Sequence, residues 1–414
     1  MTQDIVRARW QFPAASVSRA TSSRTALQTL VTSLLSVFVF AMPTDMRLWG
    51  SVSVTLPVGT LCIALGFLSV LERREIFLVG TGCWYWLAFV FWSTFSLTWA
   101  SYPDATFPKL VKYWEFLPVT WVITQYAWER RIRMQLFDAY LIGCWCGVLG
   151  VFFNFVIHRD FYISGANELE DRYSFGTDPN FLALALVIGA VTAFYRFYTE
   201  RTRYKRILFA VYIPASFLAL ALIGSRGALL ALLAATAWLL VGTNARKRIA
   251  VIVGAGLLLI LTAALPSSVT WRLSTTTDEL NNGTLDGRRG LWDEGTILVR
   301  NHPLEGIGVG GAKGALALAA HNTPLELLIE GGVISLALFY GGFVHSLYAV
   351  WKSRAKERTV LVAISMAWFV GTLSISWDAH LITWLIYALF LSVGSARKPL
   401  HRLRGVGPLP STSH

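Results

Sequence analysis

Charged residues are scarce in this sequence. They make up 14% of the 414 residues, whereas a soluble protein usually carries about 25%. Apolar residues make up 55%, and they gather in runs of about 17–25 residues, the length that crosses a ~30 Å hydrocarbon core as a helix. Because each backbone amide in such a core must be satisfied within its own helix, the composition excludes a soluble globular protein. It predicts an all-α integral membrane fold.

Cysteine is also rare, with only four residues in the chain. All four fall inside predicted spans. Cys144 and Cys146 are two positions apart, so they do not face each other on a helix. We interpret the four thiols as small packing groups and predict no disulfide from them.

Several motifs of metal- and nucleotide-dependent enzymes are missing. The sequence contains no Gly-rich P-loop and no Asp-x-Asp tripeptide. The nearest acidic candidates are Glu168, Glu170 and Asp171, which we interpret as a solvated stretch. His302 and His321 lack the spacing of metal ligands and a third partner. We therefore predict neither a metal nor a cofactor.

About twelve apolar runs can serve as membrane spans. They define a transmembrane domain over residues 26–395, with tails at 1–25 and 396–414. The predicted spans are 26–42, 50–70, 76–99, 110–127, 135–157, 180–198, 207–224, 227–243, 249–265, 325–350, 359–377 and 381–395.

The connections between these spans alternate in basic charge. Most of the 36 Lys and Arg residues fall in every second connection and in the two tails, as in TERTRYKR (199–206) and KSRAKER (352–358). Cytoplasmic connections are enriched in Lys and Arg, so both termini should be cytoplasmic. The net charge of +12 then reflects membrane topology and predicts no nucleic-acid partner.

Two connections on the opposite, outer side are long. Residues 158–179 form a shorter loop, and residues 266–324 form a long loop between the ninth and tenth spans. Within the long loop, 287–300 reads as an amphipathic helix and 312–320 as a second short helix against the membrane. Long loops between short ones are usually functional, so we expect the chemistry here.

The sequence HNTPLELLIEGG opens the tenth span. Pro324 suits the first helical position, Thr323 suits the cap, and Glu326 three residues later would complete a capping box. This pattern holds His321 just ahead of a helix N-terminus. Glu330 lies one turn beyond Glu326, and acids near a membrane are functional candidates, so it could orient His321 or Arg226.

Several cations gather on the outer side. Arg226 is fixed in GSRG (224–227), where two apolar runs meet without room for a loop. It could reach lipid headgroups, but we favour an anionic ligand between helices. Arg289 is spaced to pair with Asp293, which leaves Arg288 as the freer cation. Guanidinium groups bind phosphate oxygens bidentately, so these arginines would suit a lipid diphosphate. Further cations on this side are Arg300 and Lys313.

Five short motifs in order resemble the bacterial O-antigen ligase and polymerase superfamily, over roughly residues 175–345. The motifs are DPN (178–180), SRGALL (225–230), GRRGLW (287–292), HPLEGIGVG (302–310) and HNTPLELLIEGG (321–332).

The resemblance implies a many-helix inner-membrane glycosyltransferase with a periplasmic active site. Such enzymes move a glycan from undecaprenyl diphosphate to an acceptor without a nucleotide sugar. By position, the resemblance implies functional arginines at Arg226 and Arg288, which we expect to bind the donor diphosphate. It implies a functional histidine at His321, which we expect to be the general base. We expect support from Arg289, Arg300, Glu330, Asn322 and Lys313.

Ligases often show His, then Asn, Ser or Gln, then nine residues, Gly, two more residues, and Gly, Thr or Tyr. Here His321 and Asn322 lead to Gly332, and Ser335 stands in place of the last residue of that pattern. Polymerases tend to carry an Arg and a Gly separated by ten residues in both large loops. Arg300 and Gly311 fit that pattern in the long loop, and no arginine fits it in the shorter one. We therefore expect a ligase.

The expected reaction is the inverting, metal-independent transfer of O-antigen polysaccharide to lipid A–core oligosaccharide. The alternatives are an O-antigen polymerase and a protein O-oligosaccharyltransferase, which differ in the acceptor. A lipid-linked glycan transporter is the alternative from another class. It would need charges near the bilayer midplane and inverted repeats, and neither is evident in the sequence.

Overall fold

The computed structural model describes residues 25–45, 47–48, 52–73, 81–158, 172–245, 248–249 and 288–394. Within these residues the chain is helical, apart from a short antiparallel pair, β1 (Arg47–Leu48) and β2 (Val52–Ser53). The helices are α1 (Ala26–Ala41), α2 (Thr55–Arg73), α3 (Gly82–Phe95), α4 (Pro103–Ala127), α5 (Arg130–Val156), α6 (Pro179–Thr199), α7 (Arg203–Ile223), α8 (Arg226–Gly242), α12 (Arg288–Asn301), α13 (Gly311–Leu316), α14 (Thr323–Lys352), α15 (Arg358–Thr372) and α16 (Leu381–Gly394). Two 3-10 turns are η1 (Met42–Thr44) and η2 (Ser96–Thr98).

Eleven of the predicted spans coincide with helices of this structure, and the ninth, 249–265, lies outside the described residues. By length and composition, 6 described helices can cross a membrane, and α8, α15 and α16 are shorter apolar helices. The protein is therefore a helical membrane protein. The number of twelve spans and the sides of the termini stay predictions.

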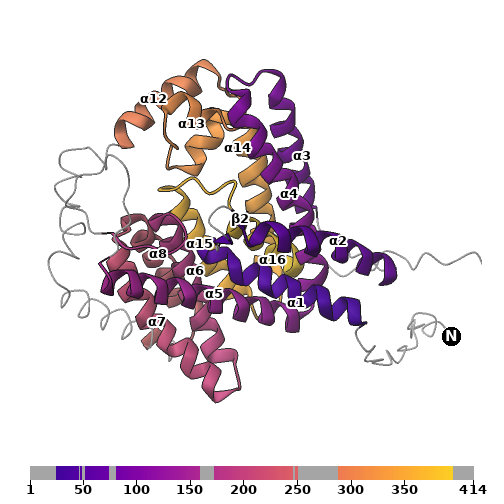
Figure 1. The fold of residues 1–414 in the computed structure, drawn as a ribbon, viewed down its shortest axis with the longest axis vertical. Helices are drawn as coiled ribbons and strands as arrows, with labels where there is room; N and C mark the ends of the chain where they lie inside the picture. The colour runs from indigo at the N-terminus through magenta and orange to yellow at the C-terminus, as the bar shows by residue number, and fades with distance from the viewer. Residues whose placement is uncertain are drawn as a thin grey trace, which may run out of the picture.

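The helices pack around α6, which contacts α5, α7, α8 and α15. A second set is formed by α3, α4, α14 and α16. In Figure 1, α12 and α13 lie at the opposite end of the molecule from α7. Apolar side chains from both sets form one continuous core, with Trp368, Trp384 and Tyr387 among its largest members.

Residues 288–329 hold a second, smaller core. Ile307, Ala312, Leu316, Ala320 and Ile329 are its buried members. The amphipathic helix predicted at 287–300 is confirmed as α12, which turns Leu291, Leu298 and Val299 toward this core. The second predicted helix, 312–320, is wrong in extent, because α13 ends after Leu316, where Ala317 adopts a left-handed φ of 58°.

Helix α14 is broken at Gly332, whose φ is 65° and ψ is −166°. The break leaves three carbonyls without helical partners, and groups from outside the helix bind them. The backbone N–H of Ile307 donates to the Ile329 carbonyl at 2.8 Å, and that of Gly308 donates to the Glu330 carbonyl at 2.9 Å. The indole of Trp92 donates to the Gly331 carbonyl at 3.0 Å.

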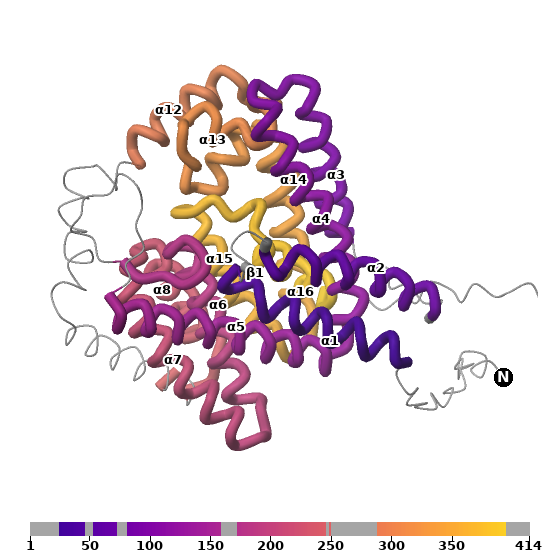
Figure 2. The backbone as a smooth tube through the Cα atoms, viewed as in Figure 1, coloured from indigo at the N-terminus to yellow at the C-terminus, as the bar shows by residue number. Residues whose placement is uncertain are grey.

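The break explains why glycine stands at position 332. A side chain there would collide with the carbonyl of Leu304, and the left-handed φ suits glycine. The turn 302–310 therefore docks onto the break in α14. Figure 2 shows the result, with α12 and α13 gathered beside α14.

Candidate functional site

The predicted capping box at α14 is wrong. The cap is Asn322, whose side chain accepts a hydrogen bond from the Leu325 N–H at 3.0 Å. The Thr323 hydroxyl instead donates to the Ile375 carbonyl at 2.7 Å and accepts from the Trp377 N–H at 2.9 Å. Thr323 thus ties the start of α14 to the connection between α15 and α16, residues 373–380, and the cap passes to the residue before it.

The same connection binds Arg288. The guanidinium Nη1 donates to the Ser374 carbonyl at 2.9 Å. Gly227, the residue after Arg226, lies so close to Ser374 that any side chain at 227 would collide with the serine hydroxyl. The tertiary structure therefore brings the starts of α8 and α12 to one point, although Arg226 and Arg288 are far apart in the sequence.

His321 lies at this junction with a left-handed φ of 49°. The Trp292 indole holds the preceding residue by donating to the Ala320 carbonyl at 3.0 Å. Burial lowers the pKa of His321, the charge of Arg288 lowers it further, and the charge of Asp178 opposes both effects. The ring is therefore neutral near pH 7.

The DPN motif (178–180) connects α6 to the start of α8. Asp178 caps α6 by accepting from the Asn180 and Phe181 N–H groups. The side-chain oxygen Oδ1 of Asn180 accepts from the Ser225 hydroxyl at 2.9 Å and from Arg172 Nη2 at 3.0 Å. This network fixes Ser225, so it also fixes the backbone that carries Arg226. It places the carboxylate of Asp178 near His321.

The remaining predicted residues have different positions. Arg289, Arg300 and Lys313 are exposed on α12 and α13. We expected Arg289 to pair with Asp293, but among the described residues no ion pair joins these two. The structure therefore gives Arg226, Arg288 and His321 a shared location and leaves these three cations at the surface.

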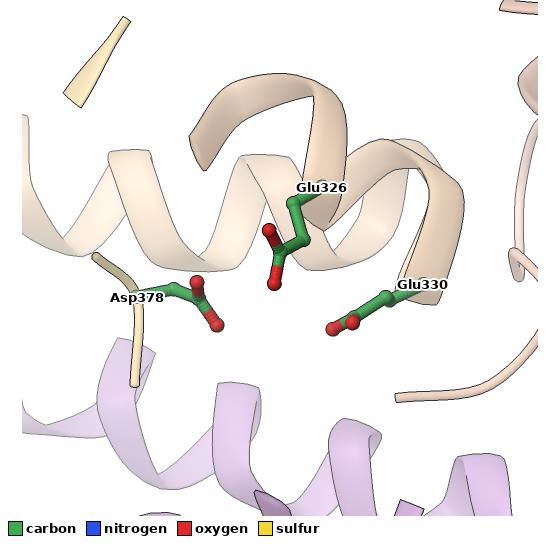
Figure 3. Close-up of side chains that lie close together, drawn as sticks. All are labelled: Glu326, Glu330 and Asp378. Atoms are coloured by element: carbon green, nitrogen blue, oxygen red, sulfur yellow. The ribbon is translucent and has the colours of Figure 1, made fainter. Parts of the chain in front are cut away.

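We expected Glu330 to orient His321 or Arg226, but its carboxylate contacts a different residue. It joins a buried cluster around Lys109 of α4, whose Nζ lies 2.8 Å from Glu326 Oε1 and 2.8 Å from Glu330 Oε2. The same ammonium lies 2.9 Å from Asp378 Oδ2. The Tyr113 hydroxyl donates a further hydrogen bond to Asp378. Figure 3 shows the three carboxylates pointing toward one another.

Asp378 ionises readily despite its burial. Burial opposes its charge, but Lys109 and the hydrogen bond from Tyr113 hold its pKa below the ordinary value. The three carboxylates present oxygens within 4.8 Å of one another, a spacing that could hold a metal ion. In this structure the ammonium of Lys109 contacts all three. The acidic stretch at Glu168–Asp171 lies outside the described residues.

Sequence reasoning missed Lys109, Asp378 and Ser374. Lys109 was assigned to the edge of a span, and Asp378 to a three-residue connection. One signal was available, because a Lys and an Asp at the ends of apolar runs are costly unless they are paired. Their partners could not be identified from the sequence, because Lys109 lies more than 200 residues before Glu326 and Glu330.

The helices and this polar junction define a multi-pass helical membrane protein. Residues 211–340 match the family described as O-antigen ligase. The match confirms the resemblance to the O-antigen ligase superfamily, and it supports an enzyme. It includes Arg226, Arg288 and His321, whereas Lys109, Asp178 and Asp378 lie outside it. No curated protein matches the chain.

Proposed function

We propose that this protein is an O-antigen ligase. It transfers O-antigen polysaccharide from undecaprenyl diphosphate to lipid A–core oligosaccharide at the periplasmic face of the bacterial inner membrane. The observation that carries the proposal is the junction at Ser374. Arg288 donates to the Ser374 carbonyl there, Gly227 next to Arg226 lies against the Ser374 side chain, and the charge of Arg288 lowers the pKa of His321.

The residues divide the chemistry between them. The acceptor hydroxyl attacks the anomeric carbon of the donor glycan and gives its proton to His321. The bond from that carbon to the diphosphate breaks, and undecaprenyl diphosphate leaves with the electron pair. Arg226 and Arg288 stabilise the negative charge that develops on the leaving group, as fixed cations do in phosphoryl chemistry. In-line attack inverts the anomeric configuration.

The neutral state of His321 supports this assignment. A general base must be unprotonated at the working pH and within reach of the proton that it accepts. Burial and Arg288 lower the pKa of His321, so the neutral form predominates at pH 7. A donor diphosphate bound beside Arg288 would bring the reacting carbon to the histidine, which accounts for the closeness of the two side chains.

The acceptor distinguishes this proposal from its relatives. A strain that lacks the protein would be analysed for its lipopolysaccharide banding pattern. A ligase is expected to leave the core without any attached repeats. A core that still carries single repeats would instead identify a polymerase, and an intact ladder with loss of protein glycosylation would identify a protein oligosaccharyltransferase.

A further inference from the structure

Lys109 connects three parts of the chain that are remote in the sequence. It lies on α4, and its ammonium contacts carboxylates from α14 and from the 373–380 connection. The side chains of Lys109, Glu330 and Asp378 are 13%, 2% and 1% exposed. Charges removed from water in this way are screened much less than surface pairs, so these contacts are strong constraints on geometry.

The two segments held by Lys109 also hold the proposed transfer site. Glu326 and Glu330 lie in the first turns of α14, which begins two residues after His321. Asp378 lies in the connection whose Ser374 carbonyl accepts from Arg288 and whose Ile375 carbonyl accepts from Thr323. Any shift of α14 against the connection therefore changes the distance from His321 to Arg288.

We propose that Lys109 is a positioning residue for the transfer reaction, a tethered cation in a three-carboxylate site that holds His321 in register with Arg288. The expected effect on transfer rests on the proposed function. The site itself is defined by the contacts of the ammonium, whatever the reaction is. Lys109 touches neither the proposed donor arginines nor His321 in the described contacts.

The charge balance explains why the cation is needed. One ammonium faces three carboxylates, and Glu326 Oε2 is buried without a hydrogen-bond partner. Without the ammonium, these buried carboxyl oxygens would lose their shared partner, and α14 would lose its link to the connection. A hard divalent cation could take its place, since Ca²⁺ binds carboxylate oxygens at about 2.3–2.6 Å. Oxygens within 4.8 Å of one another suit that radius.

The test is replacement of the tethered cation by a free one. Lys109→Ala removes the ammonium and leaves a space beside the three carboxylates. In EDTA we expect transfer to fall about 10²-fold, the size that a displacement of roughly 1 Å can cause, together with a lower Tm. Millimolar Ca²⁺ should raise the Tm of this variant and restore at least a tenth of the lost rate, while the wild-type Tm stays constant.

Two further variants control the experiment. Lys112→Ala, an exposed position one turn along α4, should keep wild-type Tm and rate. Lys109→Ala combined with Glu330→Gln lacks one ligand, so Ca²⁺ should no longer restore it. Near-normal transfer by Lys109→Ala in EDTA would overturn the proposal, and so would equal restoration with and without Glu330.

The outcomes separate this inference from the proposed function. If wild-type protein transfers no glycan but Lys109→Ala shows a Ca²⁺-dependent Tm, the three-carboxylate site stands and the ligase assignment fails. If Lys109→Ala folds under neither condition, Glu330→Gln decides, because its amide keeps the shape and weakens one contact. We expect Glu330→Gln to lower kcat about tenfold at unchanged donor KM and unchanged Tm. An unchanged kcat would contradict the positioning role.

Discussion

Arg288 donates a hydrogen bond to the backbone carbonyl of Ser374 at 2.9 Å, across 86 residues of sequence. The bond fixes the start of α12 against the connection between α15 and α16. It therefore sets the position of the guanidinium that we propose binds the donor diphosphate.

The first prediction concerns the two donor arginines. Arg226→Ala and Arg288→Ala should each lower transfer by about 10²–10³-fold, the cost of losing one preorganised donor to a developing charge. The protein should stay folded in the membrane, because both side chains are only partly buried. The measurement is single-turnover transfer with purified donor lipid, beside the melting temperature.

Arg289→Ala is the matched comparison, because it removes the neighbouring and exposed arginine of α12. It should lose much less activity than Arg288→Ala. Near-normal transfer in both Arg226→Ala and Arg288→Ala would exclude the proposed binding of the diphosphate.

The second prediction concerns His321. His321→Ala should still bind the undecaprenyl-linked donor, since both arginines remain, while transfer falls by the ~10²–10⁴-fold typical of a lost general base. Donor binding and Tm are measured beside the transfer rate. A variant that melts early and loses its donor would show that His321 only shapes the loop before α14.

The third prediction is the pH dependence. A lowered pKa for His321 means that the base is neutral above this pKa and protonated below it. The plot of log kcat/KM against pH should therefore be flat near neutrality and fall with unit slope toward acid, with its inflection below the ordinary histidine value of about 6.5. An inflection above 6.5 would contradict the assignment.

Asp178→Asn tests the cause of that inflection. The charge of Asp178 raises the pKa of His321, so its removal should move the inflection to still lower pH. The amide can still cap α6, because asparagine is a favoured cap residue. His380 does not interfere in this range, since burial, with a smaller effect of Lys112, lowers its pKa to about 3.

The fourth prediction is that wild-type transfer needs no metal. The ammonium of Lys109 contacts all three carboxylates of the one cluster in the described residues that could hold an ion. Purified wild-type enzyme should therefore keep its rate in excess EDTA. A rate that returned only on addition of Mg²⁺ or Mn²⁺ would point to a metal site outside the described residues, such as Glu168–Asp171.

The fifth prediction is the membrane topology. In a background without the native cysteines, Asp104→Cys should react with a membrane-impermeant thiol reagent from the periplasm, and Lys356→Cys should not. Both positions are exposed in the structure, so access depends on the side of the membrane. Asp286→Cys, outside the described residues, should behave as Asp104→Cys does. Labelling of Lys356→Cys from outside would reverse the assigned faces.

The sequence predicted most helices because the signal is local. An apolar run of sufficient length must become a helix in lipid, whatever its neighbours are, so the predicted spans that fall on described residues coincide with observed helices. The amphipathic pattern of α12 was equally local. The capping error came from a long-range contact, since Thr323 has the residue type of a cap but its hydroxyl is used by Ile375 and Trp377.

The order of motifs, and with it Arg226, Arg288 and His321 as candidates, was determined by the sequence alone. Only the tertiary structure decided which charges meet. It paired Glu330 with Lys109, joined Arg288 to Ser374, and placed Asp178 near His321. The physical reason is that a charge inside a helical bundle must find its partner across helix interfaces. The sequence shows that each charged side chain near the membrane needs a partner of opposite charge. The packing of α4 against α14 and the 373–380 connection decides which residue that partner is.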